Sequence, residues 1–562
     1  MASVNIENIA RSAAETGSIN ILDHYDLIEQ SMSKIQAIPG SYTPVVRIQP
    51  NENLPNIGGD LTFQISPQTT LDVYDMQNSY IKLITKRKIQ FEYQTRESLG
   101  SSWQNANVPK REKTFEPGIP NYEFFFGEKH SAGLIKVLNI TAGDKTVYNN
   151  QDFVYETNIL RALYTDEAIL RQNSLTTYAY NVDNEKNSVV GAIFDLHAAA
   201  TDMGPITLEF TYESIIPAVT FNLLARLRWL PSFFSLWQLR ITPTIENMVC
   251  KIVTRSDRIP EDYHEEVFFP RGQWMELFDK KLERVRFTTV ENLTINSAEF
   301  YASSYKLMED RYAGLVSLYS ANPLKIPFNS VNSAAGKGIN NLSTRPDGFI
   351  LDNHIRSTIP QIANRIDSVF ISFHQYDGAD GSLCVQPFAH NVRVTVNDTL
   401  YPIYPINTYN DPIVRNMFLD AINIQNNTVV TLNRDFDHSL TPYKYLRTTE
   451  HPEHCVENRT LRRGDITNFL LAIPLASDGS HNEGLYSKGG NLSWLIEGTT
   501  EDKYSSYIDP RIPPSQPRTP IDNPFKPRRI VITAVQCETL LLFSRPTSTM
   551  GQVQTTNQIM NA

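Results

Sequence analysis

The sequence has few cysteines and no long apolar run, and each absence excludes a class of protein. Its four cysteines, Cys250, Cys384, Cys455 and Cys537, lie far apart and form no CxxC pair. They therefore indicate neither a disulfide framework nor a cysteine zinc site. No uninterrupted apolar stretch reaches the roughly 18–20 residues that span a bilayer, and the N-terminus lacks the apolar core of a signal peptide. We expect synthesis and folding in the host cytosol.

An excess of basic charge is also lacking. The chain has 51 Lys and Arg against 61 Asp and Glu, a formal net charge of -10. A surface that mainly neutralises phosphates needs clustered basic residues, so we expect no sequence-specific nucleic-acid binding. The basic cluster Lys86-Arg87-Lys88 lies on a predicted strand whose other face is apolar. We interpret this cluster as a solvated or subunit-contact face, with genome contact as the alternative.

What the sequence does have is a repeated strand pattern. Residues 391–396 place Val392, Val394 and Val396 on one face and polar residues on the other, the period of a half-buried antiparallel strand. The same pattern recurs along the chain. With 562 residues, of which 41% are hydrophobic, the chain is long enough for two sandwich-sized cores. These features predict an all-β protein.

Other segments depart from plain alternation. Residues 134–147 read as a hairpin that turns at Gly143-Asp144. Apolar spacings of three and four predict helices, and a Gly-, Pro- and Asn-rich insertion follows residue 95. The helices are expected within 23–38, 155–170 and 274–285.

The chain divides by pattern into five parts. Small and polar residues predict an N-terminal arm, an aperiodic stretch predicts an internal linker, and a polar end predicts a flexible C-terminal tail. The predicted parts are a 1–55 arm, a 56–310 first domain with an exposed insertion around 95–130, a 311–352 linker, a 353–546 second domain and a 547–562 tail.

Four local clusters contain residue types that can carry chemistry, but each lacks the required spacing. Residues 451–455 hold two His and one Cys without a metal-ligand pattern, and residues 261–266 lack the second His of a metalloprotease helix. Residues 435–438 lack the Gly and Glu of a calcium loop, and residues 336–338 lack most of a P-loop. We therefore predict no catalytic, cofactor-binding or metal-binding residues and no enzymatic activity.

The order of several segments resembles the double jelly-roll major capsid proteins of tailless icosahedral double-stranded DNA viruses. This group includes virophages, polinton-like viruses and, more distantly, adenovirus hexon. The segments that carry the resemblance are 71–91 (LDVYDMQNSYIKLITKRKIQF), 134–164 (LIKVLNITAGDKTVYNNQDFVYETNILRALY), 234–252 (FSLWQLRITPTIENMVCKI), 291–307 (ENLTINSAEFYASSYKL) and 381–405 (GSLCVQPFAHNVRVTVNDTLYPIYP).

The resemblance implies two tandem antiparallel eight-stranded jelly rolls with a few flanking helices and long loop insertions. It implies a homotrimer of pseudo-hexagonal outline that tiles an icosahedral virion shell around a double-stranded DNA genome. The insertions would form a tower on the outer surface. The implied partners are other copies of the chain, penton proteins and minor or cement capsid proteins, and an internal membrane is left open.

Two other functions use similar strand patterns. A β-sandwich glycan-processing enzyme needs two carboxylates that face each other across a cleft, which one sequence neither shows nor excludes. A glycan-binding spike or penton-like protein has one such sandwich and a protruding module. Since both halves of this chain read as shell sandwiches, we favour the capsid protein.

Overall fold

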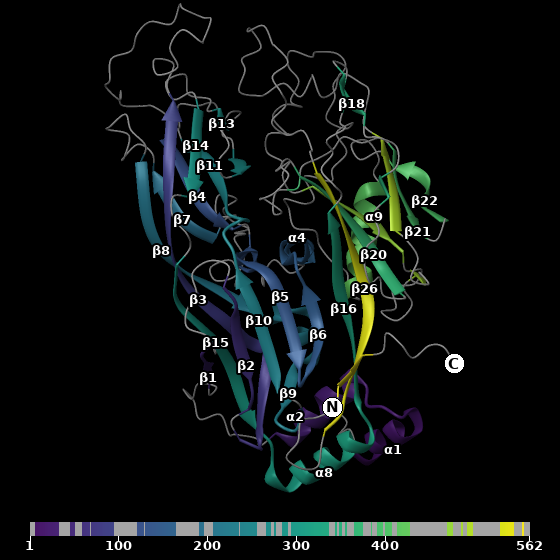
Figure 1. The fold of residues 1–562 in the computed structure, drawn as a ribbon. Helices are drawn as coiled ribbons and strands as arrows, with labels where there is room; N and C mark the ends of the chain where they lie inside the picture. The colour runs from purple at the N-terminus through teal and green to yellow at the C-terminus, as the bar shows by residue number, and fades with distance from the viewer. Residues whose placement is uncertain are drawn as a thin grey trace, which may run out of the picture.

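The computed structural model contains two upright β-sandwiches that stand side by side, with helices at the base (Figure 1). Several strands alternate between buried and more exposed residues, as the sequence pattern predicts, whereas the strands Arg365–His374 and Leu470–Pro474 are buried almost throughout. The structure describes residues 6–32, 45–50, 59–94 (except 68), 121–163 (except 129), 190–195, 206–255 (except 235), 266–270, 275–276, 284–289, 294–335, 343–345, 348–350, 355–356, 365–374, 384, 391–396, 399–406, 413–426, 469–475, 485–486, 492–497, 529–544 and 553–555.

The first sandwich has the strand order of a jelly roll. One sheet runs β1-β15-β3-β8 and the other runs β2-β10-β5-β6, with all neighbours antiparallel. Numbered from first to eighth along the chain, these orders are 1-8-3-6 and 2-7-4-5, the arrangement of a jelly roll. The strands are β1 (Val45–Ile48), β2 (Leu61–Ile65), β3 (Asp72–Gln94), β5 (Ile135–Ala142), β6 (Lys145–Asn150), β8 (Ile206–Pro217), β10 (Trp237–Pro243) and β15 (Thr294–Lys306).

The second sandwich repeats this order. Its sheets run β16-β26-β20-β23 and β19-β25-β21-β22, which again are 1-8-3-6 and 2-7-4-5. The predicted pair of jelly rolls is therefore confirmed by the strand pairing of the chain itself. The strands are β16 (Leu324–Ala335), β19 (Ile355–Arg356), β20 (Arg365–His374), β21 (Asn391–Val396), β22 (Thr399–Ile406), β23 (Leu470–Pro474), β25 (Leu492–Glu497) and β26 (Arg529–Leu542).

A further sheet lies above the first roll (Figure 1). Its order is β12-β11-β4-β7, and its strands come from the insertions between β3 and β5, between β6 and β8, and between β10 and β15. The described end of the predicted 95–130 insertion thus belongs to this sheet. The strands are β4 (Asn121–Glu128), β7 (Val190–Asp195), β11 (Val249–Arg255) and β12 (Glu266–Pro270).

The helix predicted over 274–285 is wrong. Its described residues form β13 (Met275–Glu276) and the start of β14 (Arg284–Thr289), which pairs with the far end of β3. Pairing with a long existing strand outweighs a local helical spacing. The remaining short strands are β9 (Trp229–Pro231), β17 (Ser343–Arg345), β18 (Gly348–Ile350), β24 (Leu485–Tyr486) and β27 (Val553–Thr555).

The helices pack at three places. Three form the base, one stands between the rolls and one covers the second roll (Figure 1). The helices are α1 (Ile6–Thr16), α2 (Ile21–Ser31) and α8 (Glu309–Ala321) at the base, α4 (Phe153–Leu163) between the rolls, α9 (Ile413–Asn426) on the second roll, and the short α7 (Asn222–Leu227), η2 (Ser131–Leu134) and η4 (Ala218–Thr220).

Three predicted parts need correction. The prediction of an arm over 1–55 is wrong for α1 and α2, because Ile9 and Ala13 of α1 and Leu27 and Ile28 of α2 are buried in the core. The prediction of a linker over 311–352 is wrong for its first part, which holds most of α8 and all of β16. Strand β16 pairs with β26 along its whole length. The prediction of a flexible C-terminal tail is wrong for β27, which pairs with the end of β26. In each case tertiary partners order a segment whose own pattern is weak.

The two rolls share part of their apolar core. Leu324, Ile326 and Phe328 of β16 and Leu540 and Leu542 of β26 belong to the same buried cluster as the base helices and the first roll. A separate cluster fills the upper part of the second roll. The two rolls are therefore joined through the base.

Candidate functional site

The sequence clusters with possible chemistry mostly lie outside the described residues. This holds for residues 451–455, 435–438, 336–338 and 261–265, while Glu266 begins β12. Within the described part of the chain, no group of three or more His, Cys, Asp or Glu residues could hold a metal ion. None of the helices in that part is long and apolar enough to cross a membrane.

The basic cluster on β3 is split between two faces. Lys86 is exposed and forms an ion pair with Glu209 on β8. Arg87 points inward and is only 1% exposed, so the prediction that all three residues share a solvated face is wrong for Arg87. Neighbouring residues of a strand point to opposite faces, which placed Arg87 on the face of Leu83 and Ile89.

Arg87 forms a fully buried ion pair with Glu128. The distance between Nη1 and Oε1 is 2.7 Å, and both side chains are 1% exposed. Glu128 ends β4, so the pair ties the upper sheet to the first roll. Removing one partner of such a pair leaves an uncompensated buried charge, whereas two apolar residues can replace both. Loss of either side chain alone would therefore destabilise the contact between the upper sheet and the first roll.

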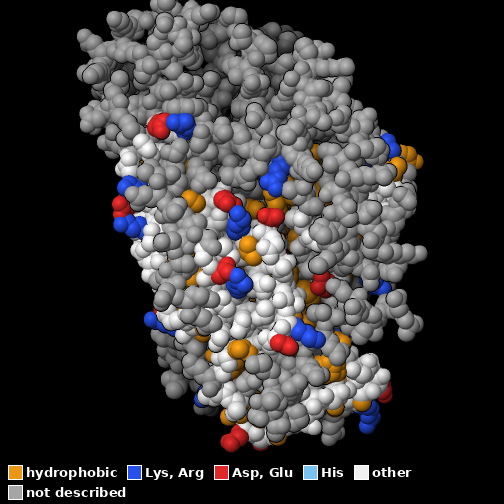
Figure 2. Space-filling view, viewed as in Figure 1, with side chains coloured by type: hydrophobic (Ala, Val, Ile, Leu, Met, Phe, Trp, Pro, Cys, Tyr) orange, Lys and Arg blue, Asp and Glu red, His pale blue; other side chains and the backbone are white. Residues whose placement is uncertain are grey.

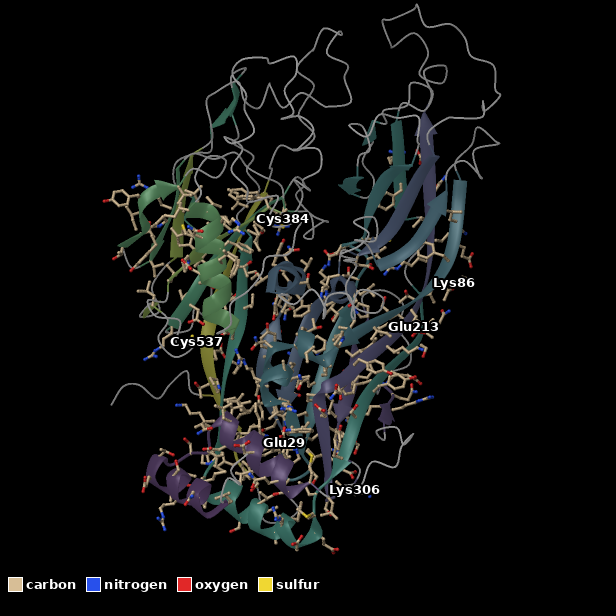
Figure 3. All side chains as sticks on the ribbon, turned by 180° about the vertical axis from the view of Figure 1, so that it is seen from behind. Glu29, Lys86, Glu213, Lys306, Cys384 and Cys537 are labelled. Carbon is tan, nitrogen blue, oxygen red and sulfur yellow. The ribbon has the colours of Figure 1, made fainter. Side chains whose placement is uncertain are left out.

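The outer face of β3 and β8 is lined by paired charges. Lys82 Nζ lies 2.7 Å from Glu213 Oε2, and Lys86 pairs with Glu209 four residues further along the same face of β3. Figure 3 shows Lys86 and Glu213 on this flank of the molecule. Because acidic and basic side chains alternate, the face is polar without a strong net charge.

Aromatic side chains continue this outer face toward β15 and β1. Tyr80 and Tyr301 stack with ring centroids 4.9 Å apart, and the Arg47 guanidinium lies 5.4 Å from the Tyr301 centroid. Tyr301 also donates a hydrogen bond of 2.5 Å to Glu299. This bond lowers the pKa of Glu299, whose carboxylate also accepts from Gln49. The outer face of β1, β15, β3 and β8 is thus aromatic and charged. We call it the roll 1 face.

Opposite charges are also paired on the face shown in Figure 2, where acidic and basic side chains lie next to one another. Lys136 of β5 pairs with Glu246 at 3.0 Å, and Arg240 of β10 pairs with Asp60. Exposed pairs of this kind contribute little to stability, with a median of about 0–1 kcal/mol. Their effect is to keep exposed sheet faces soluble.

Helix α4 fills the junction between the rolls. Phe153 packs into the core of the first roll, and Ile159 packs into the core of the second. Tyr155 contacts Val531 of β26, and its ring lies 5.5 Å from that of His374 on β20. Burial raises the pKa of Tyr155 to about 12. The junction is thus a packed contact between the two rolls.

A buried carboxyl group lies at the same junction. Glu156 of α4 accepts hydrogen bonds from the Tyr148 hydroxyl and from Asn150 Nδ2, the latter at 2.9 Å. Burial raises the pKa of Glu156 to about 7. Glu538 of β26 also acts electrostatically on Tyr148, and burial raises the pKa of Glu538. Two acidic side chains, Glu156 and Glu538, therefore both act on Tyr148 where the rolls join.

The base is fixed by a buried histidine. The Nε2 atom of His24 lies 3.0 Å from the Trp229 carbonyl oxygen, and its Nδ1 atom lies 2.7 Å from the Tyr319 hydroxyl. A carbonyl oxygen can only accept, so Nε2 donates and Nδ1 accepts from Tyr319. Burial lowers the pKa of His24 to about 4, so the ring is neutral. His24 links α2 to β9 and α8.

In the second roll, Cys537 donates to the buried carboxylate of Asp367 at 2.6 Å. Asp367 lies at an irregularity in the pairing of β20 with β26, and burial raises its pKa to about 6. Cys384 and Cys537 form no disulfide and lie apart (Figure 3). A thiol beside one carboxyl group is a structural contact, since a reactive cysteine needs a positive environment.

The outer flank of the second roll exposes apolar side chains. Tyr404 and Leu400 of β22 are 80% and 39% exposed, and Ile413 at the start of α9 is 44% exposed. β22 is at the edge of its sheet order, and β21, β22 and α9 lie together on the side of the molecule away from the first roll (Figure 1). We call Leu400, Tyr404 and Ile413 the roll 2 flank.

The described residues therefore form exposed sheet and helix surfaces and a packed junction between the two rolls. Sequence reasoning singled out Lys86 but missed Glu156, His24 and the roll 2 flank. The signal for Glu156 was a lone acid on an otherwise apolar helix face, next to Tyr155 and Ile159. The roll 2 flank had no sequence signal, because alternation cannot tell an edge strand from an inner one.

Comparison with known proteins finds similarity in structure only. No family model matches the sequence, and no curated protein matches it. The Faustovirus major capsid protein matches with a TM-score of 0.43 and 8% identity, over 96% of this chain and 97% of that chain. The mavirus major capsid protein matches with a TM-score of 0.45 and 10% identity, over 94% and 93%. A chain of the Sputnik virophage structure matches with a TM-score of 0.45 and 11% identity, over 93% and 92%.

Proposed function

We propose that the chain is a major capsid protein that forms homotrimers, and that these trimers tile an icosahedral shell around a double-stranded DNA genome. The observation that carries this proposal is the repeat of one strand order, 1-8-3-6 and 2-7-4-5, in both halves of the chain. The segment order of the sequence, which resembles this class of capsid protein, supports it.

The geometric reason is that each chain supplies two similar rolls, so a few copies of the chain are enough to build a hexagonal tile. Three chains around a threefold axis place six similar rolls in a ring, and the outline approaches a hexagon. Hexagonal tiles cover a surface without gaps. The upper sheet, built from three insertions of the first roll, would form the exposed tower.

The described chemistry fits a structural protein. Among the described acidic and histidine side chains, those with large pKa changes are His24, Glu156 and Asp367, and all three are buried and held by neighbouring side chains or backbone. Buried groups of this kind stabilise and position elements. We propose that the protein is not an enzyme, is located in the virion shell, and meets penton and minor capsid proteins there.

The native mass of the purified protein tests this proposal. We expect light scattering to give three times the mass of the chain, and negative-stain images of the same sample to show six-cornered particles. A stable monomer at high concentration would contradict the capsid proposal. It would favour the glycan-binding or glycan-processing alternative, which an array of immobilised glycans and a hydrolase assay would then examine.

A further inference from the structure

Buried polar side chains gather where the upper sheet meets the first roll. Three successive inward-facing residues of β3 are Leu83, Thr85 and Arg87. Thr85 is fully buried and Arg87 is 1% exposed. A hydroxyl group and a guanidinium group thus lie in an interior where apolar side chains are usual.

A second hydroxyl group lies close to Thr85 on the neighbouring strand. In the pairing of β3 with β8, Ser214 lies opposite Leu83, and Thr85 is two residues from Leu83 on the same face. Thr85 and Ser214 are therefore diagonal neighbours, a relation in which residues are about 7–8 Å apart. Ser214 is fully buried like Thr85. Polar groups at such a separation can be bridged by one water molecule.

The segment that leads from the upper sheet into the first roll supplies a third hydroxyl group. Strand β4 of the upper sheet ends at Glu128, and η2 begins at Ser131. A Cβ atom at Gly133 of η2 would lie only 3.0 Å from Glu128 Cβ, so η2 packs directly on the buried ion pair. η2 also lies against β8, the strand of Ser214. Ser131 is fully buried there.

The hydroxyl groups differ from the charged groups in how they are satisfied. We call Thr85, Arg87, Glu128, Ser131 and Ser214 the joint cluster. Its two charged members bind each other at 2.7 Å. Its three hydroxyl oxygens have no hydrogen-bond partner among the described residues. Buried polar groups are unfavourable without a partner, and ordered water is the usual partner where the protein supplies none.

Charge and burial decide what the joint cluster can bind. Arg87 and Glu128 neutralise each other, so the cluster carries no net charge and does not favour a buried ion. All five side chains are at most 1% exposed, so an organic ligand could not enter without opening the fold. Water both donates and accepts, as a hydroxyl group does, and it is small enough to reach groups on three separate elements.

We infer that the joint cluster is a hydration site, in which ordered water molecules bridge the hydroxyl groups of Thr85, Ser131 and Ser214. The water links β3 and β8 of the first roll to η2, the segment between β4 of the upper sheet and β5. The joint between the upper sheet and the first roll is then held by the Arg87–Glu128 pair and by bound water. This inference is independent of the proposed function, because it concerns a joint within one chain.

The number of long-lived water molecules in the protein tests the inference. Magnetic relaxation dispersion of water oxygen-17 measures this number in solution. The double variant Thr85→Val with Ser214→Ala removes two hydroxyl groups and changes the shape of the core little. We expect it to hold at least one long-lived water molecule fewer per chain than the wild type. Ser372→Ala is the matched control and should keep the wild-type number, because the hydroxyl group of Ser372 is buried but already bonds to His374 at 2.7 Å.

The stability of one single variant gives an independent measurement. If water satisfies the Thr85 hydroxyl group, Thr85→Val removes a favourable hydrogen bond, and we expect the urea midpoint to fall. If this hydroxyl group has no partner at all, the same change removes an unfavourable buried group, and the midpoint rises. Since valine has nearly the shape of threonine, the two cases differ in sign.

Two results would overturn the inference. One is a double variant that keeps the wild-type number of long-lived water molecules, and the other is a higher urea midpoint for Thr85→Val. Ser131→Ala covers the case in which the double variant does not fold, because Ser131 lies outside the strands. This variant should also hold fewer long-lived water molecules than the wild type, and an unchanged number would again contradict the hydration site.

Discussion

At the scale of single residues, burial decides what the charged groups of this chain do. Glu156 and His24 are both buried, but burial moves their pKa values in opposite directions, to about 7 and about 4. In each case burial penalises the charged form. The two residues therefore affect stability in opposite pH ranges.

Glu156 gives a pH-dependent prediction. Its folded pKa of about 7 lies above the ordinary value of 4.5. The protonated carboxyl group of Glu156 therefore makes its full contribution to the free energy of unfolding below pH 4.5. This contribution is lost as the pH rises through 7. A change of this size corresponds to about 3 kcal/mol. In the Glu156→Gln variant the amide oxygen can still accept from Tyr148 and Asn150. We therefore expect the variant to be more stable than the wild type at pH 8, by up to about 3 kcal/mol.

Urea denaturation at pH 5 and pH 8 measures this difference. The groups that face Glu156 are Tyr148 and Asn150, with Glu538 nearby on β26. Asp420→Asn on the exposed side of α9 is the control and should follow the wild type at both values. If Glu156→Gln is equally destabilising at pH 5 and pH 8, the carboxyl group is not protonated in the fold.

Residue positions also show what the sequence could and could not predict. Alternation placed Val392, Val394 and Val396 on a buried face, and the structure confirms it. The same rule should have placed Arg87 inward, but its charge and its two basic neighbours favoured a solvated face. The buried partner, Glu128, is 41 positions away and lies on β4, in the insertion that follows β3. A long-range ion pair of this kind leaves no local signal.

At the scale of elements, local signals predicted hairpins well and termini poorly. The hairpin over 134–147 and the helix near 155 were correct, because their turn and spacing are encoded locally. The base helices α1 and α2 looked like an arm, because their apolar residues are sparse. They are ordered by contact with α8 and β16. Ile19 accepts a backbone hydrogen bond from Lys325 at 2.8 Å.

The packing of α2 leads to a paired prediction. Leu27 is fully buried and Leu22 is 69% exposed on the same helix. Leu27→Ala should cost about 2–5 kcal/mol, because it removes buried methyl groups and leaves a cavity. Leu22→Ala, the matched control, should change stability by less than about 0.5 kcal/mol. The denaturant midpoints of the two variants measure this difference in stability. Equal midpoints would mean that α2 is a detached arm in solution.

At the scale of the whole molecule, the strand pattern of the sequence indicated two sandwiches, and only the resemblance of the segment order implied that both have the strand order of a jelly roll. Strand order depends on which distant strands pair, as when β16 and β26, about 200 residues apart, lie side by side. The candidate surfaces depend on the same pairing, since β22 is exposed only because no described strand lies beyond it in its sheet. These features are global, so no window of sequence contains them.

The shared core predicts that the two rolls fold together. Residues of β16 and β26 pack in the same buried cluster as α1, α2 and the first roll, so a chain cut between Asn322 and Pro323 separates parts of one core. The fragment 323–562 alone would expose Leu324, Ile326 and Leu540. We expect each fragment alone to be insoluble or to lack native structure, and the two fragments to form a soluble one-to-one complex when co-expressed. Calorimetry of the intact chain should show one cooperative transition. Two separate transitions, or a second fragment that folds alone, would mean that the base does not couple the rolls.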